Sequence, residues 1–186
     1  MNRTTRIVII GLLMVTLIIA GGFLLILRAR SNTVAQPNQP IPLASVTEHG
    51  VTVEIMLKRD QGEQPILEGI FTPTGEDFHL YSKDLPRNGI QGLGRPTLLE
   101  VISTDSIQPT GSLTADQGET SEYYEPLNLG LPIYPAGPVT LQLPIQIMTA
   151  DAEIAAELSI TYMTCKAGVC LPPVDDKRVS VVIPVN

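Results

Sequence analysis

The only two cysteines of the chain, Cys165 and Cys170, are the residues best suited to chemistry. Between them, Gly168 allows a turn that brings them to the Cα separation of roughly 5.5 Å at which a disulfide forms. Outside the cytoplasm such a pair is expected to be bridged. On spacing alone three uses stay open: a structural bridge, a reversible redox pair, and a Cu(I) site in which Met163 adds a soft sulfur ligand.

The sequence around the cysteines argues against some of this chemistry. Thioredoxin-type activation needs Cys-x-x-Cys at a helix N-terminus, whereas here four residues separate the cysteines and two prolines follow closely. A purely structural bridge over so short a loop would stabilise the fold by only about 2 kcal/mol. A modestly activated pair suits passive electron relay better than strong oxidation. Alternation from Ile160 and Tyr162 predicts that Cys165 lies on the opposite, less buried face of its strand.

The segments that must position the cysteines have the pattern of β-strands. Apolar and polar residues alternate over 51–58, 139–147, 154–162 and 179–183, and 97–102 is a β-type run. Segment 152–158 has helical propensity but continues directly into β-branched residues, so 152–162 is predicted to be one strand. Loops rich in glycine and proline are expected at 84–96 and 109–138. The pattern predicts an all-β antiparallel sandwich of about 140 residues.

The N-terminal part has a different composition. Segment 7–27 contains Thr16 as its only polar side chain, and a helix of that length, about 31 Å, spans the hydrocarbon core of a bilayer. We therefore expect a short cytoplasmic tail at 1–6, a single transmembrane helix at 7–27, a Pro-rich linker at 28–45 and a domain at 46–186. A cleaved signal peptide, with a weak cleavage candidate at Ala35, is the alternative.

Charge divides the chain in the same way. Residues 1–30 hold four arginines and no acid, so the remainder carries the other eight basic side chains against all 19 acidic ones. So acidic a body excludes nucleic acid as a partner, because it would repel phosphates. The short N-terminal tail and the α-amino group favour an inside N-terminus, which predicts a cell-membrane protein with its C-terminal domain outside the cytoplasm.

Four stretches of sequence together resemble a known family. The run 160–173, ITYMTCKAGVCLPP, resembles the N-terminal extracytoplasmic domain of the thiol:disulfide interchange protein DsbD. Weaker matches occur in the same order at 78–82 (FHLYS), at 94–97 (GRPT), and at Tyr134 with 139–145, so that the resemblance covers 46–186. It implies an immunoglobulin-like sandwich and a reversible disulfide. In that family the downstream cysteine, here Cys170, would form the mixed disulfide and Cys165 would resolve it.

The same resemblance implies partners and neighbouring residues. The domain would take electrons from a thioredoxin-like donor and pass them to extracytoplasmic thiol proteins, without cofactor or metal. An aromatic loop would shield the cysteines, with Tyr123 and Tyr124 as candidates. Tyr81 would be a neighbour of the pair, and His79 is either a histidine at the core edge or a site residue.

Two departures from the family leave the electron donor open. The cysteines are closer together than in the best-known member, and the sequence contains neither the polytopic electron-carrying domain nor the C-terminal thioredoxin domain. Thiol:disulfide interchange activity is expected only if the bridge is redox active. The rival interpretation is a non-catalytic immunoglobulin-like binding module with a structural disulfide.

Overall fold

The computed structural model describes residues 39–59, 64–102 and 106–185. The chain divides into two units, Met1–Gln36 and Pro37–Asn186, and the described residues all belong to the second. The predicted tail at 1–6 and transmembrane helix at 7–27 lie outside them. Within the described ranges, no helix is long and apolar enough to cross a membrane.

The larger sheet has the strand order β1-β2-β3-β10-β6, with the short β7 also paired to β10. All of its neighbouring strands are antiparallel. The predicted alternation of apolar and polar residues in β2 places its apolar side chains on the inner face of the sheet. Val51, Val53, Ile55 and Leu57 of β2 are fully buried. The strands are β1 (Ile41–Glu48), β2 (Val51–Lys58), β3 (Ile66–Pro73), β6 (Ile107–Pro109), β7 (Thr114–Ala115) and β10 (Val139–Ile147).

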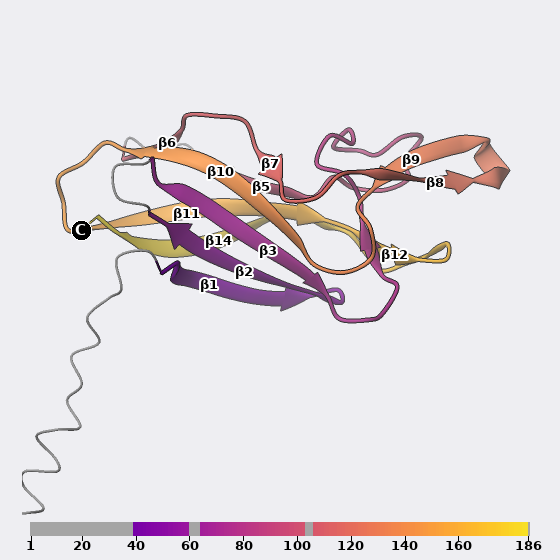
Figure 1. Cartoon of the computed structure of the whole chain (residues 1–186), viewed down its shortest axis with the longest axis horizontal. Coiled ribbons are helices and arrows are strands. Elements are labelled where there is room, and N and C mark those ends of the chain that lie inside the picture. The colour runs from indigo at the N-terminus through magenta and orange to yellow at the C-terminus, as the bar shows by residue number, and fades with distance from the viewer. Residues whose placement is uncertain (1–38, 60–63, 103–105, 186) are drawn as a thin grey trace, which may run out of the picture. The chain divides into compact units, whose positions relative to one another are not determined.

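A second sheet, of strand order β14-β11-β5, faces the first (Figure 1). It consists of β5 (Leu98–Val101), β11 (Glu153–Tyr162) and β14 (Val174–Pro184). Inward residues of both sheets form one hydrophobic core, in which Phe71 of β3 meets Tyr162 of β11 edge to face. Two antiparallel sheets around a shared core make a sandwich, and the arrangement is consistent with the immunoglobulin-like class.

Two small antiparallel sheets lie at one end of the sandwich, on the right in Figure 1. One has the order β13-β12-β4, from β4 (His79–Leu80), β12 (Thr164–Lys166) and β13 (Val169–Cys170). The other pairs β8 (Thr120–Tyr124) with β9 (Leu129–Ile133) through the single 3-10 turn η1 (Glu125–Leu127). This end carries both cysteines.

The structure confirms the main strands predicted from alternation, including β11 where helical propensity competed. It differs from the sequence prediction in two places. The first strand begins at Ile41, inside the segment 28–45 expected to be linker. The segment 109–138, expected to be a loop, contains the β8–β9 hairpin. Alternation did not reveal this hairpin because β8 has no buried residue and so has no buried face to mark its period.

Candidate functional site

Cys165 and Cys170 are joined by a disulfide across a two-stranded hairpin. The two residues lie directly opposite each other on β12 and β13, with Cα atoms 4.1 Å apart. The backbone N–H of Leu171 donates to the carbonyl of Thr164 at 3.0 Å, so the cysteines form a non-hydrogen-bonded pair, in which opposing side chains approach most closely. The pairing of the strands therefore places the two sulfurs together.

The turn between the cysteines is the tight kind that their spacing requires. Ala167 and Gly168 both have positive φ, at 48° and 78°, as in the two-residue type I′ turn that suits the twist of a hairpin. Lys166 and Val169 close the turn as the next cross-strand pair. The expectation that Gly168 lets the chain fold back is confirmed.

The two cysteines differ strongly in exposure. Cys165 is fully buried, whereas Cys170 is exposed. The prediction of a less buried face for Cys165 is wrong because the face opposite Tyr162 packs into a second apolar cluster, which contains Cys165, rather than facing solvent. An approaching nucleophile can therefore reach only one sulfur, that of Cys170.

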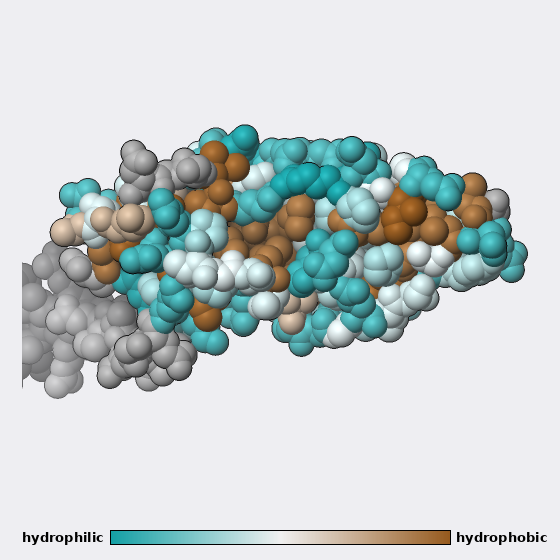
Figure 2. All heavy atoms as spheres, turned by 90° about the horizontal axis from the view of Figure 1, so that it is seen from above, coloured by the Kyte–Doolittle hydropathy of each residue, from teal (hydrophilic) through white to brown (hydrophobic). Residues whose placement is uncertain are grey.

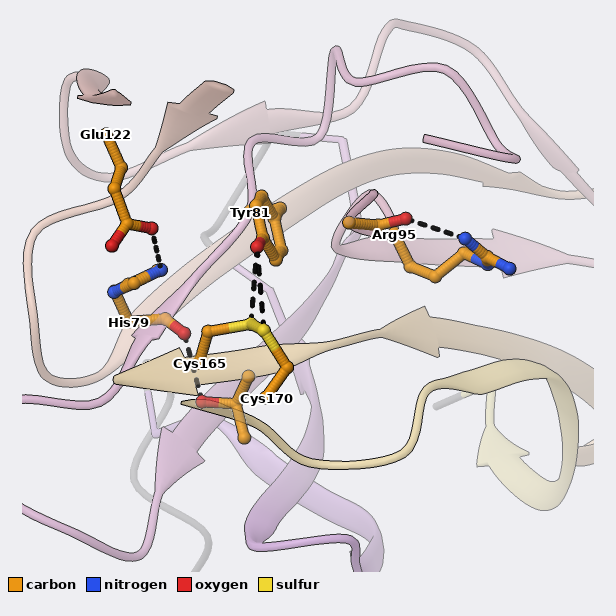
Figure 3. The surroundings of a disulfide bond; sticks show 8 residues. His79, Tyr81, Arg95, Glu122, Cys165 and Cys170 are labelled. Atoms are coloured by element: carbon orange, nitrogen blue, oxygen red, sulfur yellow. Dashed lines mark hydrogen bonds and ion pairs between the residues drawn. A yellow bond between two sulfur atoms is a disulfide. The ribbon is translucent and has the colours of Figure 1, made fainter. Parts of the chain in front are cut away.

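Tyr81 places its hydroxyl directly over the disulfide (Figure 3). The phenolic oxygen lies 3.2 Å from Sγ of Cys165 and 3.9 Å from Sγ of Cys170. Burial, assisted by the negative charge of Glu122, raises the pKa of Tyr81 to about 12. The hydroxyl therefore keeps its proton near neutral pH and can donate to sulfur. The predicted proximity of Tyr81 to the pair agrees with this arrangement.

The segment GRPT at 94–97 contacts Tyr81 through its first and last residues. The Thr97 hydroxyl donates to the backbone carbonyl of Tyr81 at 2.6 Å. Gly94, with φ of 78°, lies against the tyrosine ring, and a Cβ there would approach ring carbons to 3.0 Å and Leu85 Cδ2 to 2.8 Å. Only glycine suits both that backbone conformation and that contact. Gly94 and Thr97 thus fix the positions of the ring and of the backbone of Tyr81.

His79 lies beside the disulfide strand and contacts an acidic residue that the sequence did not single out. Its backbone pairs with Cys165, its ring meets that of Tyr81 edge to face, and its Nε2 lies 3.1 Å from a carboxylate oxygen of Glu122. Nε2 is itself buried, and in the described residues it has no other polar partner. Burial lowers the pKa of His79, and Glu122 only partly opposes this shift.

The two candidate shielding tyrosines behave differently. Tyr124 lines a small cavity of about 80 Å³ beside Cys170, together with Tyr81 and Glu122. Tyr123, next to it on β8, points to the other face because strand side chains alternate, and its hydroxyl donates to Asn128. Only Tyr124 is therefore placed to cover the sulfur. Figure 2 shows apolar surface at this end of the domain, where β8 and β9 lie.

The remaining charged side chains near the hairpin are engaged elsewhere. Lys166, the neighbour of Cys165, has its ammonium 3.0 Å from Asp77, and Arg95 reaches Asp175 at 3.0 Å. No group of three or more histidine, cysteine or acidic side chains suited to a metal ion occurs in the described ranges. The arrangement can expose one sulfur to attack while a phenol donates to the other.

Removing the Tyr81 hydroxyl tests its contact with the sulfurs. In Tyr81→Phe the departing Cys165 thiolate loses a donor, and because hydrogen bonds to charged groups contribute about 1.5–3 kcal/mol, reduction by dithiothreitol should slow by about tenfold or more. Stopped-flow measurement of disulfide reduction gives this rate. Tyr162→Phe removes another tyrosine hydroxyl, which donates to the backbone carbonyl of Glu48 and not to a sulfur. This variant should leave the rate unchanged. Equal rates in all three proteins would contradict the assigned role.

The buried histidine should make stability depend on pH. Because folding lowers the pKa of His79, the unfolded chain binds more protons below the usual histidine pKa of about 6.5, and the free energy of unfolding should fall as pH falls through that window. His79→Gln should flatten this part of the profile. Urea denaturation between pH 5 and 8 measures it, with His49→Asn, at an exposed histidine, as control. Parallel profiles for wild type and His79→Gln would exclude the effect.

Comparison with known proteins gives similarity at the level of solved structures. No family model matches the chain, and no curated protein matches it. The chain is similar to the reduced DsbD N-terminal domain of Neisseria meningitidis, with 15% identity and a TM-score of 0.42 over 84% of this chain and 94% of that one. It is also similar to the GAE domain of GGA2p from Saccharomyces cerevisiae, with 11% identity and a TM-score of 0.35 over 77% and 96%.

Proposed function

We propose that this protein is a thiol–disulfide exchange domain that relays reducing equivalents through the Cys165–Cys170 pair. The observation that carries the proposal is the asymmetry of the disulfide: Cys170 is an exposed residue that lines a cavity, and Cys165 is fully buried beneath a protonated phenol. Exchange requires one sulfur open to attack and a second thiol within reach to resolve the mixed disulfide. A bridge that served only as a staple would need neither feature.

Each half of the exchange is balanced in atoms and electrons. A thiolate of the donor attacks Sγ of Cys170, the Cys165–Cys170 bond breaks, and Cys165 leaves as a thiolate that accepts a hydrogen bond from Tyr81. The donor's second cysteine thiolate then attacks the sulfur of the donor's first cysteine in the mixed disulfide. This step forms the donor's disulfide and releases the Cys170 thiolate. Two electrons have passed to this protein, the donor is left with a disulfide, and water supplies the protons.

Delivery of the electrons reverses the same steps. The Cys170 thiolate attacks a disulfide of the acceptor and forms a mixed disulfide. The Cys165 thiolate, held opposite by the strand register, attacks Cys170 and restores the bridge while the acceptor leaves reduced. The resemblance of 160–173 to the DsbD N-terminal domain supports a thioredoxin-like donor and extracytoplasmic thiol proteins as acceptors.

The energetics of the bridge are compatible with reversible opening. The disulfide has a sequence separation of only 5, so it stabilises the fold by about 2 kcal/mol. The main core is formed by the two large sheets and does not include either cysteine. We therefore expect the domain to stay folded when the pair is reduced, as a carrier must.

The proposal extends to the surroundings of the domain. We infer an immunoglobulin-like sandwich carried on a single N-terminal membrane helix, with the domain outside the cytoplasm. The apolar segment 7–27 and the acidic composition of the remainder support this placement. In such a compartment a disulfide persists without a resident cofactor.

Trapping of a mixed disulfide tests the exchange mechanism. In Cys165→Ser the resolving thiol is gone, so the accessible Cys170 thiolate should attack a single-cysteine thioredoxin-like donor supplied as its mixed disulfide with a small thiol. The small thiol leaves as a thiolate, and Cys170 stays joined to the donor. In Cys170→Ser the buried Cys165 should capture little. Non-reducing gel electrophoresis followed by mass spectrometry measures both complexes.

A staple predicts a different outcome for the same variants. Both variants would lose about 2 kcal/mol of stability, as under the exchange proposal, but neither would trap a partner. The double variant Cys165→Ser, Cys170→Ser controls for non-covalent association. The reduction potential is a second discriminator, because a structural bridge lies below about −300 mV and an exchange-competent one lies above it. Equal stability losses without any trapped complex would favour the binding module.

Protease accessibility tests the proposed topology. If 7–27 spans the membrane with its N-terminus inside, protease added to intact spheroplasts should digest 46–186, and the protein should resist carbonate extraction. A cytoplasmic marker protein controls for lysis. Protection of 46–186 in intact spheroplasts would rule out this orientation.

A further inference from the structure

The cavity beside the disulfide contains a single charged side chain. It is lined by Tyr81, Leu93, Glu122, Tyr124, Leu131, Gly168 and Cys170, so six of the seven residues carry no charge. The carboxylate of Glu122 is about one-third exposed, with 30% of its side-chain surface accessible. A nucleophile approaching Cys170 through this cavity therefore meets one negative charge among uncharged walls.

Within the described part of the chain, that charge has no cationic partner near neutral pH. Its close neighbour is the imidazole of His79 at 3.1 Å, and burial lowers the pKa of that ring, which keeps it uncharged. The basic residues nearest in sequence to the site are each paired with an aspartate outside the cavity: Lys166, Lys83 and Arg95. Glu122 thus presents a net negative charge to the cavity.

The negative charge also acts on the atoms at the disulfide. Glu122 contributes to the raised pKa of Tyr81, whose hydroxyl contacts both sulfurs. The carboxylate therefore acts on a group within 3.2 Å of Cys165 Sγ. Attack on a disulfide is made by an anionic thiolate, so a nearby carboxylate disfavours it unless the nucleophile brings a compensating positive charge.

We propose that Glu122 makes this site selective for thiols that carry a positive charge beside the sulfur, and hence for partner proteins with basic residues around the attacking cysteine. The choice of protein partner rests on the proposed exchange function, whereas the charge preference is a property of the cavity itself. In the reaction, the thiolate attacks Cys170 Sγ, Cys165 leaves as a thiolate, and the cationic group stays beside the carboxylate without being consumed.

Three small thiols of similar size test the preference directly. Cysteamine is cationic, 2-mercaptoethanol neutral and 3-mercaptopropionate anionic. Rates of reduction of the purified full-length chain, held in a neutral detergent, are measured at pH 8 and low salt. Each rate is divided by the rate of the same thiol with a small neutral disulfide, because thiolates of different pKa differ in intrinsic nucleophilicity. A unit charge about 6 Å away in a water-like dielectric changes such a rate by about threefold. We therefore expect cysteamine to react about tenfold faster than 3-mercaptopropionate.

Two variants assign the preference to one residue. Glu122→Gln keeps the shape of the side chain and removes its charge, so the ratio of the cationic to the anionic rate should fall about tenfold, to near one. Glu153→Gln changes the net charge equally but lies at the start of β11, paired with Pro184, and should keep the wild-type ratio. High salt should compress the wild-type ratio, because it screens exposed charges.

The outcomes separate this inference from the proposed function. Equal rates for the three thiols in the wild type, or an unchanged ratio in Glu122→Gln, would overturn the inference and leave the exchange function standing. A charge preference without mixed-disulfide capture by Cys165→Ser would support the inference and remove the exchange function. Failure of every thiol to reduce the bridge would refute both, since both require an accessible Cys170.

Discussion

The site depends on one pairing of backbone strands, that of β4 with β12. Thr164 lies opposite Leu80 and Cys165 opposite His79, and the Thr164 hydroxyl adds a bond to the His79 carbonyl at 2.9 Å. Because side chains alternate along a strand, a slip of one residue would turn Tyr81 away from the sulfurs. The positions of the phenol and the imidazole relative to the disulfide are therefore set by one register.

The fold separates the task of stability from that of chemistry. The main core lies between the two large sheets, while a second small cluster contains Tyr81, Leu85, Leu131 and Cys165. Since Cys165 belongs to the small cluster and Cys170 to neither cluster, opening the bridge removes little of the burial that stabilises the domain. The two large sheets stabilise the domain, and the small sheet β13-β12-β4 carries the reactive sulfur of Cys170.

The sequence predicted what has a strong local signal. Alternation located β2, β10, β11 and β14, and the cysteine spacing with Gly168 indicated the turn. The motif FHLYS placed Tyr81 near the pair through a family resemblance, but Glu122 carried no signal because it is one of 19 acidic residues and acts only through tertiary contact with His79. The burial of Cys165 was missed because the second cluster depends on long-range packing, which strand alternation does not reveal.

The electrostatics around the sulfurs contain two opposing contributions. Tyr81 donates to sulfur and stabilises a departing thiolate, whereas Glu122 destabilises negative charge in the same place. A strongly oxidising disulfide needs a thiolate stabilised by positive charge or a helix N-terminus. In the described residues no helix begins beside Cys165, and the adjacent cation, Lys166, is paired with Asp77. A site with one neutral donor and one carboxylate should favour neither the thiolate nor the disulfide strongly. Such a balance suits a carrier that accepts electrons from one thiol protein and gives them to another.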